Sequence, residues 1–225
     1  MKRILAAIIA AALLLSGCTS ASRPAESAPP TGTPSPSPTP VVTPTPEPEP
    51  ADDELVLVRD YIPGIFIDLK YATTDNFTGR VIYDSDEAYL RYGTVKKLLC
   101  AQNELSGRGL SLKIWDAYRP VSAQFKLWEI CPNPVYVSDP NNGYSKHSRA
   151  NTVDITLVTD TGKSIPMPSG FDDFTSLADR DYSDVSDEAA ENARLLENVM
   201  VENGFVPYSG EWWHYSDSVA YDVYE

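Results

Sequence analysis

Residues 145–157 of the 225-residue chain read SKHSRANTVDITL, and this stretch decides most about the fold. Its second half, Val153–Leu157, alternates apolar and polar residues, which is the period of a β-strand with one buried face. His147 is one of two histidines in the whole chain, and Asp154 follows it seven residues later, where the alternation begins. A carboxylate on a buried strand needs a partner, and a metal ion is one. The stretch therefore predicts a core strand that begins with a candidate metal ligand.

The second histidine, His214, lies in the segment EWWHY at 211–215. If this segment is extended, Glu211 and His214 do not share a face by simple alternation, so a local twist or bulge is required. Two histidines and Asp154 make a three-ligand zinc set with a fourth position open to water, which is the catalytic pattern. Spacing alone leaves an alternative open, in which one histidine lies on the surface and the other is held in the core by hydrogen bonds.

The elements expected around these segments alternate in type without regular βαβ spacing. Because crossover helices are too few for a parallel sheet, we expect an α+β fold, a single domain with a mainly antiparallel sheet flanked by helices. Strands are expected over Leu55–Arg59, Ile65–Tyr71, Leu112–Tyr118, Thr152–Val158, Phe205–Tyr208 and Glu211–Tyr215, and helices over Thr94–Leu105, Val121–Ile130 and from a Ser186 N-cap to about Asn203.

Composition limits the class of protein. With 42% hydrophobic and 22% charged residues the chain suits an ordinary globular domain, so a wholly disordered or fibrous protein is excluded. The formal net charge of −14 argues against a nucleic-acid partner, because such partners are held by phosphate contacts to basic groups.

The first residues predict export. Lys2 and Arg3 precede an apolar run, Ile4–Leu15, that suits a signal peptide and is too short to span a bilayer. The run ends in Leu15-Ser16-Gly17-Cys18, which resembles a bacterial lipobox, so residues 1–17 are expected to be a lipoprotein signal peptide and Cys18 the lipidated mature N-terminus. The protein would then be anchored to the outer face of a bacterial membrane. The alternative is an ordinary secretory signal with a chance cysteine.

Residues 18–53 are expected to form a disordered linker. This segment is dominated by Pro, Ser, Thr, Ala, Glu and Asp, a composition that cannot bury enough surface to offset the entropy of ordering. Its repeated X-Pro units favour extended polyproline II, the conformation of a stalk. The folded domain is expected over residues 54–225. It contains Cys100 and Cys131, which an exported protein could pair in a disulfide or keep as two free, buried thiols.

Four segments, taken in order, carry a resemblance to a known family: DLKYATTDNFTG at 68–79, WDAYRP at 115–120, SKHSRANTVDITL at 145–157 and EWWHY at 211–215. Together they resemble the VanX-type D-alanyl-D-alanine dipeptidases of the zinc peptidase family M15, over nearly all of residues 60–216. The Ser-x-His-x6-Asp and Glu-x-x-His elements are shared across the wider family, which includes D,D-carboxypeptidases. The first and last segments point to the dipeptidase branch.

The resemblance implies roles for five residues. His147, Asp154 and His214 become ligands of one Zn2+ per chain, and Glu211 becomes the base that works with a metal-activated water. Arg119 becomes the residue that steadies negative charge on the scissile carbonyl. These roles suit the chemistry, because a carboxylate can accept a proton near neutral pH and a guanidinium can donate two aligned hydrogen bonds to an oxyanion.

The resemblance also implies a substrate pocket. Ser145 and Asp172 match positions that hold the free ammonium group of the dipeptide, and Tyr71 matches a residue near the pocket. Asp172 has a plain alternative as one loop aspartate among several. Departures from the family affect the pocket wall and rim: Ala150 stands where Gly is common, Pro168 replaces a Gly, and the stretch between Arg119 and the first histidine is shorter.

The sequence thus predicts a membrane-anchored, zinc-dependent hydrolase of D-Ala-D-Ala. One alternative is a D,D-carboxypeptidase that trims D-Ala-terminated stem peptides of peptidoglycan, which a shortened rim could admit. A second is a non-catalytic wall-binding module. Glu211 and Arg119 together argue against this module, because binding alone needs neither a base nor an oxyanion donor.

Overall fold

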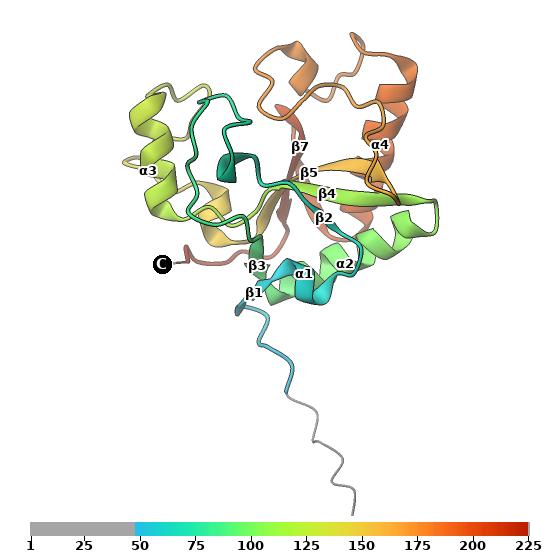
Figure 1. Cartoon of the computed structure of the whole chain (residues 1–225), viewed down its shortest axis with the longest axis horizontal. Coiled ribbons are helices and arrows are strands. Elements are labelled where there is room, and N and C mark those ends of the chain that lie inside the picture. The colour runs from blue at the N-terminus through green and yellow to red at the C-terminus, as the bar shows by residue number, and fades with distance from the viewer. Residues whose placement is uncertain (1–47, 225) are drawn as a thin grey trace, which may run out of the picture. The chain divides into compact units, whose positions relative to one another are not determined.

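The computed structural model describes residues 48–224 (Figure 1). The expected signal peptide, Cys18 and most of the linker therefore lie outside the described residues. The strands are β1 (Leu55–Leu57), β2 (Phe66–Ile67), β3 (Tyr89–Arg91), β4 (Leu110–Asp116), β5 (Thr152–Thr159), β6 (Phe205–Tyr208) and β7 (Glu211–Asp217). The helices are α1 (Val58–Tyr61), α2 (Tyr92–Ser106), α3 (Val121–Ile130) and α4 (Asp187–Glu202), with 3-10 turns η1 (Lys70–Ala72), η2 (Lys146–Arg149) and η3 (Ser176–Ala178).

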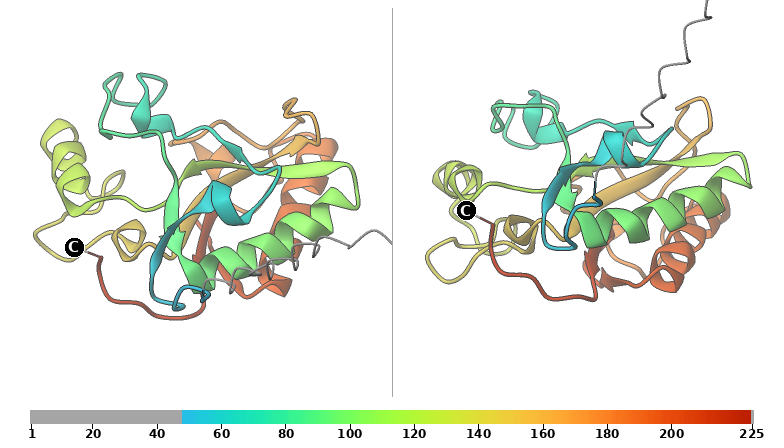
Figure 2. Two further views of the ribbon diagram at one scale, coloured as in Figure 1. Left: turned by 60° about the horizontal axis from the view of Figure 1, so that its bottom comes forward. Right: turned by 90° about the horizontal axis from the view of Figure 1, so that it is seen from below.

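The central sheet has five strands in the order β2-β4-β5-β7-β6. Only the pair β2–β4 is parallel among these strands, and β1 and β3 form a separate antiparallel pair. Helices α2 and α4 lie side by side along one face of the sheet, as Figure 2 shows. The predicted α+β fold with a mainly antiparallel sheet is confirmed.

The packing of the hydrophobic core against one face of the sheet determines which side chains lie on the other face. Ile114 of β4 pairs with Ile155 of β5 and Leu112 with Leu157, and all four belong to one buried hydrophobic cluster with residues of α2 and α4. Because side chains alternate along a strand, Asp154 points away from that cluster, to the face opposite Ile155. The alternation that predicted β5 therefore also places the Asp154 carboxylate on the face of the sheet opposite the hydrophobic core.

Helix boundaries agree with the prediction closely, and α3 spans the expected residues. Ser186 caps α4 by accepting a hydrogen bond from Ala189 N at 3.2 Å. The N-terminal strands differ from the prediction. The first expected strand, Leu55–Arg59, ends at Leu57, because the residue opposite Leu57 is Tyr89, where its partner β3 begins. The chain then continues directly into α1. The second expected strand, Ile65–Tyr71, is reduced to the two residues of β2. Strand β3 was not predicted, because three residues are too few to show an alternation.

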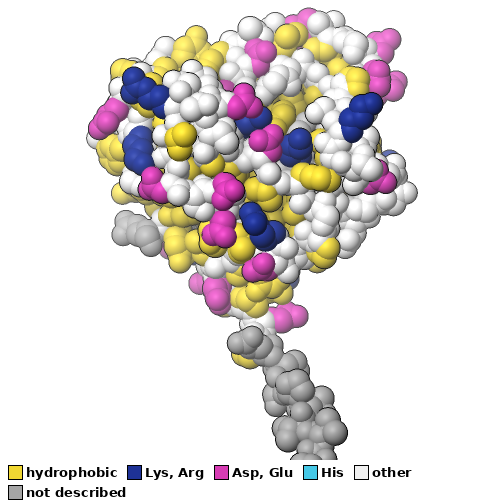
Figure 3. Space-filling view, viewed as in Figure 1, with side chains coloured by type: hydrophobic (Ala, Val, Ile, Leu, Met, Phe, Trp, Pro, Cys, Tyr) yellow, Lys and Arg dark blue, Asp and Glu magenta, His cyan; other side chains and the backbone are white. Residues whose placement is uncertain are grey.

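Cys100 and Cys131 are not paired, and Cys100 is exposed, so the structure contradicts both the disulfide and the pair of buried thiols. No helix within residues 48–224 combines the length and apolar character needed to cross a membrane. Contacts with the domain begin before residue 54, since Gly93 N donates to Asp52 O at 2.9 Å. Acidic side chains are scattered over the face seen in Figure 3, interleaved with basic and hydrophobic ones.

Candidate metal centre and active site

Three acidic or imidazole side chains form a row across the middle of the sheet. In the register of the strands Asp116 of β4 is opposite Asp154 of β5, which in turn is opposite His214 of β7. Cross-strand neighbours point to the same face, so the three side chains converge. An irregularity between Ile114 and Asp116 makes this possible, because the extra residue Trp115 brings Asp116 into line with Asp154.

His147 reaches the row from η2, just before β5. The hydroxyl of Ser145 caps this turn by accepting a hydrogen bond from His147 N at 3.3 Å. His147 Nδ1 lies 2.8 Å from Ala117 O, an acceptor only, so this nitrogen donates. Nε2 is then free to bind a cation, and it lies 3.3 Å from Asp154 Oδ2. Ala150 ends the turn with φ 58°, a left-handed conformation that explains why glycine suits this position.

His147, Asp154 and His214 can hold a metal ion. All three are buried, and one potential ligand atom from each lies within 4.8 Å of the others. His214 Nδ1 is 2.9 Å from Asp154 Oδ1. Burial alone would raise the pKa of Asp154, but the two adjacent imidazoles hold it well below its usual range. Two imidazoles and one ionised carboxylate are a donor set that zinc accepts, so the residues fit the metal.

Glu211 lies beside this set. Its Oε2 is 3.4 Å from His214 Nδ1, although residues three apart on a regular strand point to opposite faces. The pairing of β6 with β7 explains this, because it shifts register between Pro207 and Tyr208. This is the irregularity that the spacing of Glu211 and His214 required. Burial, and then the charge of Asp154, raise the pKa of Glu211, which favours proton transfer at a pH nearer neutrality.

Arg119 is held in a buried ion pair. Its Nε and one terminal nitrogen donate to Asp116 Oδ2 at 3.1 and 2.5 Å, and the other terminal nitrogen donates to Gln124 Oε1 at 2.9 Å. These bonds use three of the five N–H groups of a guanidinium, which leaves two for a ligand. Arg119 N also donates to His147 O at 3.2 Å, so the arginine is fixed next to the candidate metal ligand.

Asp116 belongs to the site although its sequence context does not single it out. Its side chain is fully buried, and Oδ2 lies 3.6 Å from His147 Nδ1. The signal that marked Asp154, a carboxylate on an apolar strand, was present here as well. It was obscured because Asp116 joins the row only through the irregularity at Trp115.

The residues predicted to bind substrate form two groups. Ser145 lines a cleft of about 280 Å³ together with Glu211 and His214. Tyr71 and Asp172 lie on the Arg119 side, where the Tyr71 hydroxyl donates to Asp172 Oδ2 at 2.7 Å and the Arg119 guanidinium stacks 5.1 Å from the Tyr71 ring. Burial raises the pKa of Asp172 to about 7. Asp172 also has φ 52°, a strained conformation that is common at functional sites.

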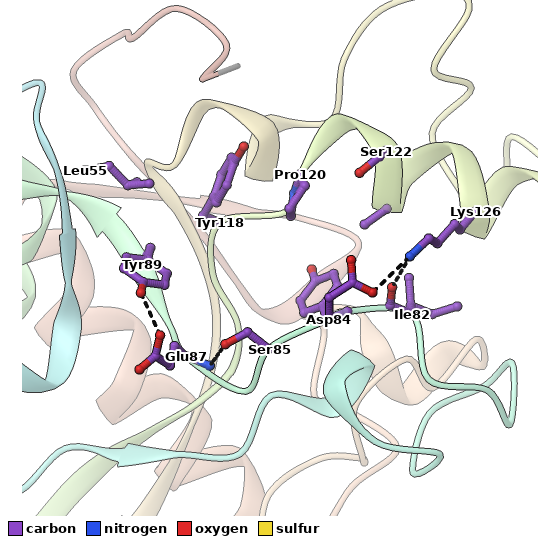
Figure 4. A pocket seen from close by; sticks show the side chains of 12 residues that line it. Leu55, Ile82, Asp84, Ser85, Glu87, Tyr89, Tyr118, Pro120, Ser122 and Lys126 are labelled. Carbon is purple, nitrogen blue, oxygen red and sulfur yellow. Dashed lines mark hydrogen bonds and ion pairs between the residues drawn. The ribbon is translucent and has the colours of Figure 1, made fainter.

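A second cavity, of about 270 Å³ and more apolar, is lined by residues of β1, of β3, of the segment 82–87 and of the start of α3 (Figure 4). Tyr118 and Pro120, the two neighbours of Arg119 in sequence, contribute to its wall, together with Leu55, Tyr89 and Lys126. The side chains of the candidate metal ligands and Glu211 are not among its lining residues. This cavity is therefore separate from the candidate active site.

A metallopeptidase is the class of enzyme that this fold and site define. The chain belongs to peptidase family M15, whose model, described as D-ala-D-ala dipeptidase, matches residues 51–224. It is similar to the D-alanyl-D-alanine dipeptidase of Escherichia coli strain K12, with 39% identity over 162 residues that cover 72% of this chain and 83% of that protein. The enzyme of the same name from Enterococcus faecium is 35% identical over 176 residues, 69% of this chain and 87% of that protein. The enzyme from Enterococcus faecalis strain V583 is 34% identical over 185 residues, 73% and 91% respectively.

Proposed function

We propose that this protein is a zinc-dependent D-alanyl-D-alanine dipeptidase, in which His147 Nε2, a carboxylate oxygen of Asp154 and His214 Nδ1 hold one zinc ion. The observation that carries the proposal is the convergence of these three buried side chains within 4.8 Å, with a carboxylate, Glu211, 3.4 Å from one of them. The names of the relatives supply the substrate, the dipeptide D-Ala-D-Ala.

Glu211 is the general base and then the general acid. Zinc, when bound, supplies a Lewis acid that makes a water molecule nucleophilic near pH 7. The Glu211 carboxylate accepts the proton that this water loses, and it later gives that proton to the leaving amine. Its raised pKa supports the first step, because the anion of a weaker acid is a better proton acceptor. The protonated carboxyl group can still donate to the leaving amine, because that amine is more basic than the carboxylate.

Arg119 stabilises the negative charge that develops on the scissile carbonyl oxygen. Two of its N–H groups remain after the bonds to Asp116 and Gln124, and a permanently charged fork of this kind suits an oxyanion. The ion pair with Asp116 aims the guanidinium before substrate arrives, so little reorganisation is needed during the reaction.

Asp172, Tyr71 and Ser145 hold the substrate. Asp172 offers a carboxylate to the free ammonium group of the dipeptide, and the hydrogen bond from Tyr71 fixes its direction. Ser145 lies in the same cleft as Glu211 and His214, where its hydroxyl can bond to the polar groups of the peptide. The cleft is at the small end of ligand pockets, which start at roughly 300 Å³, and this supports a small substrate.

The place of action completes the proposal. Residues 1–17 direct export, Cys18 carries the lipid anchor, and the Pro-rich linker up to residue 53 separates the domain from the membrane. The enzyme then acts on D-Ala-containing peptides outside the cytoplasm, in wall turnover or nutrient salvage, and does not deplete the cytoplasmic pool of D-Ala-D-Ala.

Mass spectrometry of the products tests the function. Purified domain is incubated with D-Ala-D-Ala or with a stem pentapeptide that ends in D-Ala-D-Ala, with and without added zinc. We expect zinc-dependent release of D-Ala from the dipeptide and little from the pentapeptide. Release from the pentapeptide alone would identify a D,D-carboxypeptidase, and binding without release from either would identify a wall-binding module. Each of these two results would refute the proposal.

A further inference from the structure

Arg180 is a buried arginine that the proposed mechanism does not use. It lies in the loop between η3 and α4, thirty-one residues before Glu211, and its side chain is only 11% exposed. Nε donates to Tyr208 O at 2.8 Å, one terminal nitrogen donates to Glu211 O at 3.1 Å and His214 O at 3.2 Å, and the other donates to Glu197 Oε2 at 2.8 Å and Tyr215 Oη at 3.1 Å. All five N–H groups of the guanidinium therefore have an acceptor.

The three backbone carbonyls among these acceptors mark the irregular part of the β6–β7 hairpin. Pro207 pairs with Tyr215, but the next residue of β6, Tyr208, pairs with Glu211. The intervening residues of β7, 212–214, consequently have no partner on β6. Buried carbonyls that lose a strand partner need another donor. The guanidinium of Arg180 supplies it to the carbonyl of His214, and it also bonds to the carbonyls of Tyr208 and Glu211, the pair that bounds the irregular segment.

Glu211, which precedes the unpaired residues, and His214, the last of them, are the two β7 residues with chemical roles. The side chains of Glu211 and His214 meet at 3.4 Å only because the strand is irregular between them. One terminal nitrogen of Arg180 bonds to the carbonyls of both residues, so it fixes the distance between their backbones. The ion pair with Glu197 on α4 and the bond to Tyr215 in turn fix the guanidinium.

We propose that Arg180 is a positioning residue, which keeps β7 in the irregular conformation that brings the base Glu211 and the metal ligand His214 together. This inference rests on the proposed function, since that function gives Glu211 and His214 their roles. Arg180 acts through the backbone and does not touch the reacting atoms. Lysine cannot replace it, because an ammonium has three donors at one point, whereas the carbonyls of Tyr208, Glu211 and His214 are reached by a planar fork.

The inference predicts a particular pattern of defects. Without the fork, β7 relaxes, the His214 imidazole moves away from Asp154, and Glu211 moves with it. Loss of a group that orients a metal ligand typically costs 10–100-fold in metal affinity or activity. Asp172 and Tyr71, which bind the substrate, belong to other segments, so KM stays near the wild-type value. If Arg180 only stabilised the fold, its loss would lower stability but would not produce this pattern, in which zinc affinity and kcat fall while KM stays constant.

The experiment compares Arg180→Ala and Arg180→Lys with a control, Arg194→Ala. Arg194 is on the exposed side of α4 and stacks 5.4 Å from the ring of Tyr182, a residue that Arg180 also contacts. Zinc dissociation constants are measured by competition with a chromogenic chelator, and kcat and KM are measured with D-Ala-D-Ala at saturating zinc. For both Arg180 variants we expect zinc binding weakened by roughly 10–100-fold and kcat lowered at least about tenfold, with KM within about twofold. The control stays at wild-type values.

Chemical rescue separates positioning from general folding. Guanidinium at millimolar concentration, far below denaturing levels, should enter the space left in Arg180→Ala and restore part of the zinc affinity and kcat, but it should leave Arg180→Lys unchanged. If Arg180→Ala does not fold, the zinc affinity of Arg180→Lys decides. Arg180→Lys with wild-type zinc affinity and kcat would overturn the inference. A wild-type protein that binds zinc but does not cleave D-Ala-D-Ala would refute the proposed function alone, because the comparison of zinc affinities would still test Arg180.

Discussion

Replacement of Arg119 by methionine should damage the protein in two separable ways, because Arg119 is both the partner of a buried carboxylate and the proposed oxyanion donor. Asp116 has a fully buried side chain and receives two hydrogen bonds from Arg119, at 3.1 and 2.5 Å. At an effective dielectric constant of about 20, charges about 3 Å apart attract by roughly 5 kcal/mol. Removal of one partner of such a pair commonly costs about 3–5 kcal/mol.

The lower end of that range applies to Asp116. Its Oδ1 still accepts hydrogen bonds from the Tyr83 hydroxyl at 2.5 Å and from Ala117 N at 2.9 Å, so the carboxylate keeps part of its stabilisation. We therefore expect Arg119→Met to lower the free energy of unfolding by about 3 kcal/mol. This loss is a large part of the free energy of unfolding of a typical domain, which is roughly 5–15 kcal/mol. A low activity of this variant could therefore reflect unfolding as well as the loss of the oxyanion donor.

The double variant Asp116→Asn, Arg119→Met removes the ambiguity. It has no unpaired buried charge, so it should recover most of the lost stability, whereas kcat should stay depressed because the oxyanion donor is still missing. Urea denaturation followed by tryptophan fluorescence gives the stability, and initial rates at saturating zinc give kcat. Recovery of kcat together with stability would refute the role of Arg119 in charge stabilisation. Equal stability of the single and double variants would refute the energetic argument about the pair.

Substitutions of Glu211, Asp172 and Cys18 test three other parts of the proposed function. Glu211→Gln keeps the shape of the side chain, so zinc content should stay at one per chain while kcat falls by about 10²–10⁴-fold, and near-normal turnover would exclude Glu211 as the base. Asp172→Asn removes a carboxylate whose pKa is raised to about 7. The metal-free wild type should therefore lose stability as pH rises from about 4 to about 7, because the folded protein must give up a proton that the unfolded chain has already lost, whereas the variant should not; urea midpoints of the two proteins that change equally between pH 5 and pH 8 would contradict this. The KM of the variant should rise about tenfold or more. Cys18→Ala should move the full-length protein from the membrane fraction to the soluble extracytoplasmic fraction, and an unchanged distribution would exclude lipid anchoring at this residue.

The parts of the site that could be predicted from sequence are those with a local pattern. His147 and Asp154 are joined by a short spacing that ends in a clear strand alternation, and Glu211 and His214 lie in one five-residue segment. The requirement for an irregular strand at 211–214 also followed from spacing, because a regular strand separates residues three apart. Helix α2 was predicted from the helical spacing of its apolar residues, and α4 from its Ser186 cap, its acidic first turn and Gly204 as its stop, all of which are local signals.

The parts that could not be predicted depend on contacts between distant segments. Asp116 joins the row of polar side chains only through the extra residue Trp115, and no pattern within β4 reveals which strand will lie opposite. Arg180 bonds to three backbone carbonyls of β6 and β7, and a carbonyl is common to every residue type. The short strand β3 is defined by its pairing with β1 and not by its own three residues.

The most direct test of the central claim is a zinc titration of metal-free protein in which bound zinc and the release of D-Ala from D-Ala-D-Ala are measured on the same samples. We expect both quantities to rise together and to reach a plateau at one zinc per chain. His214→Ala, which removes one of the three proposed ligands, should show neither tight binding nor activity under the same conditions. Full dipeptidase activity without bound zinc, or stoichiometric zinc in a variant that lacks both His147 and His214, would contradict the account.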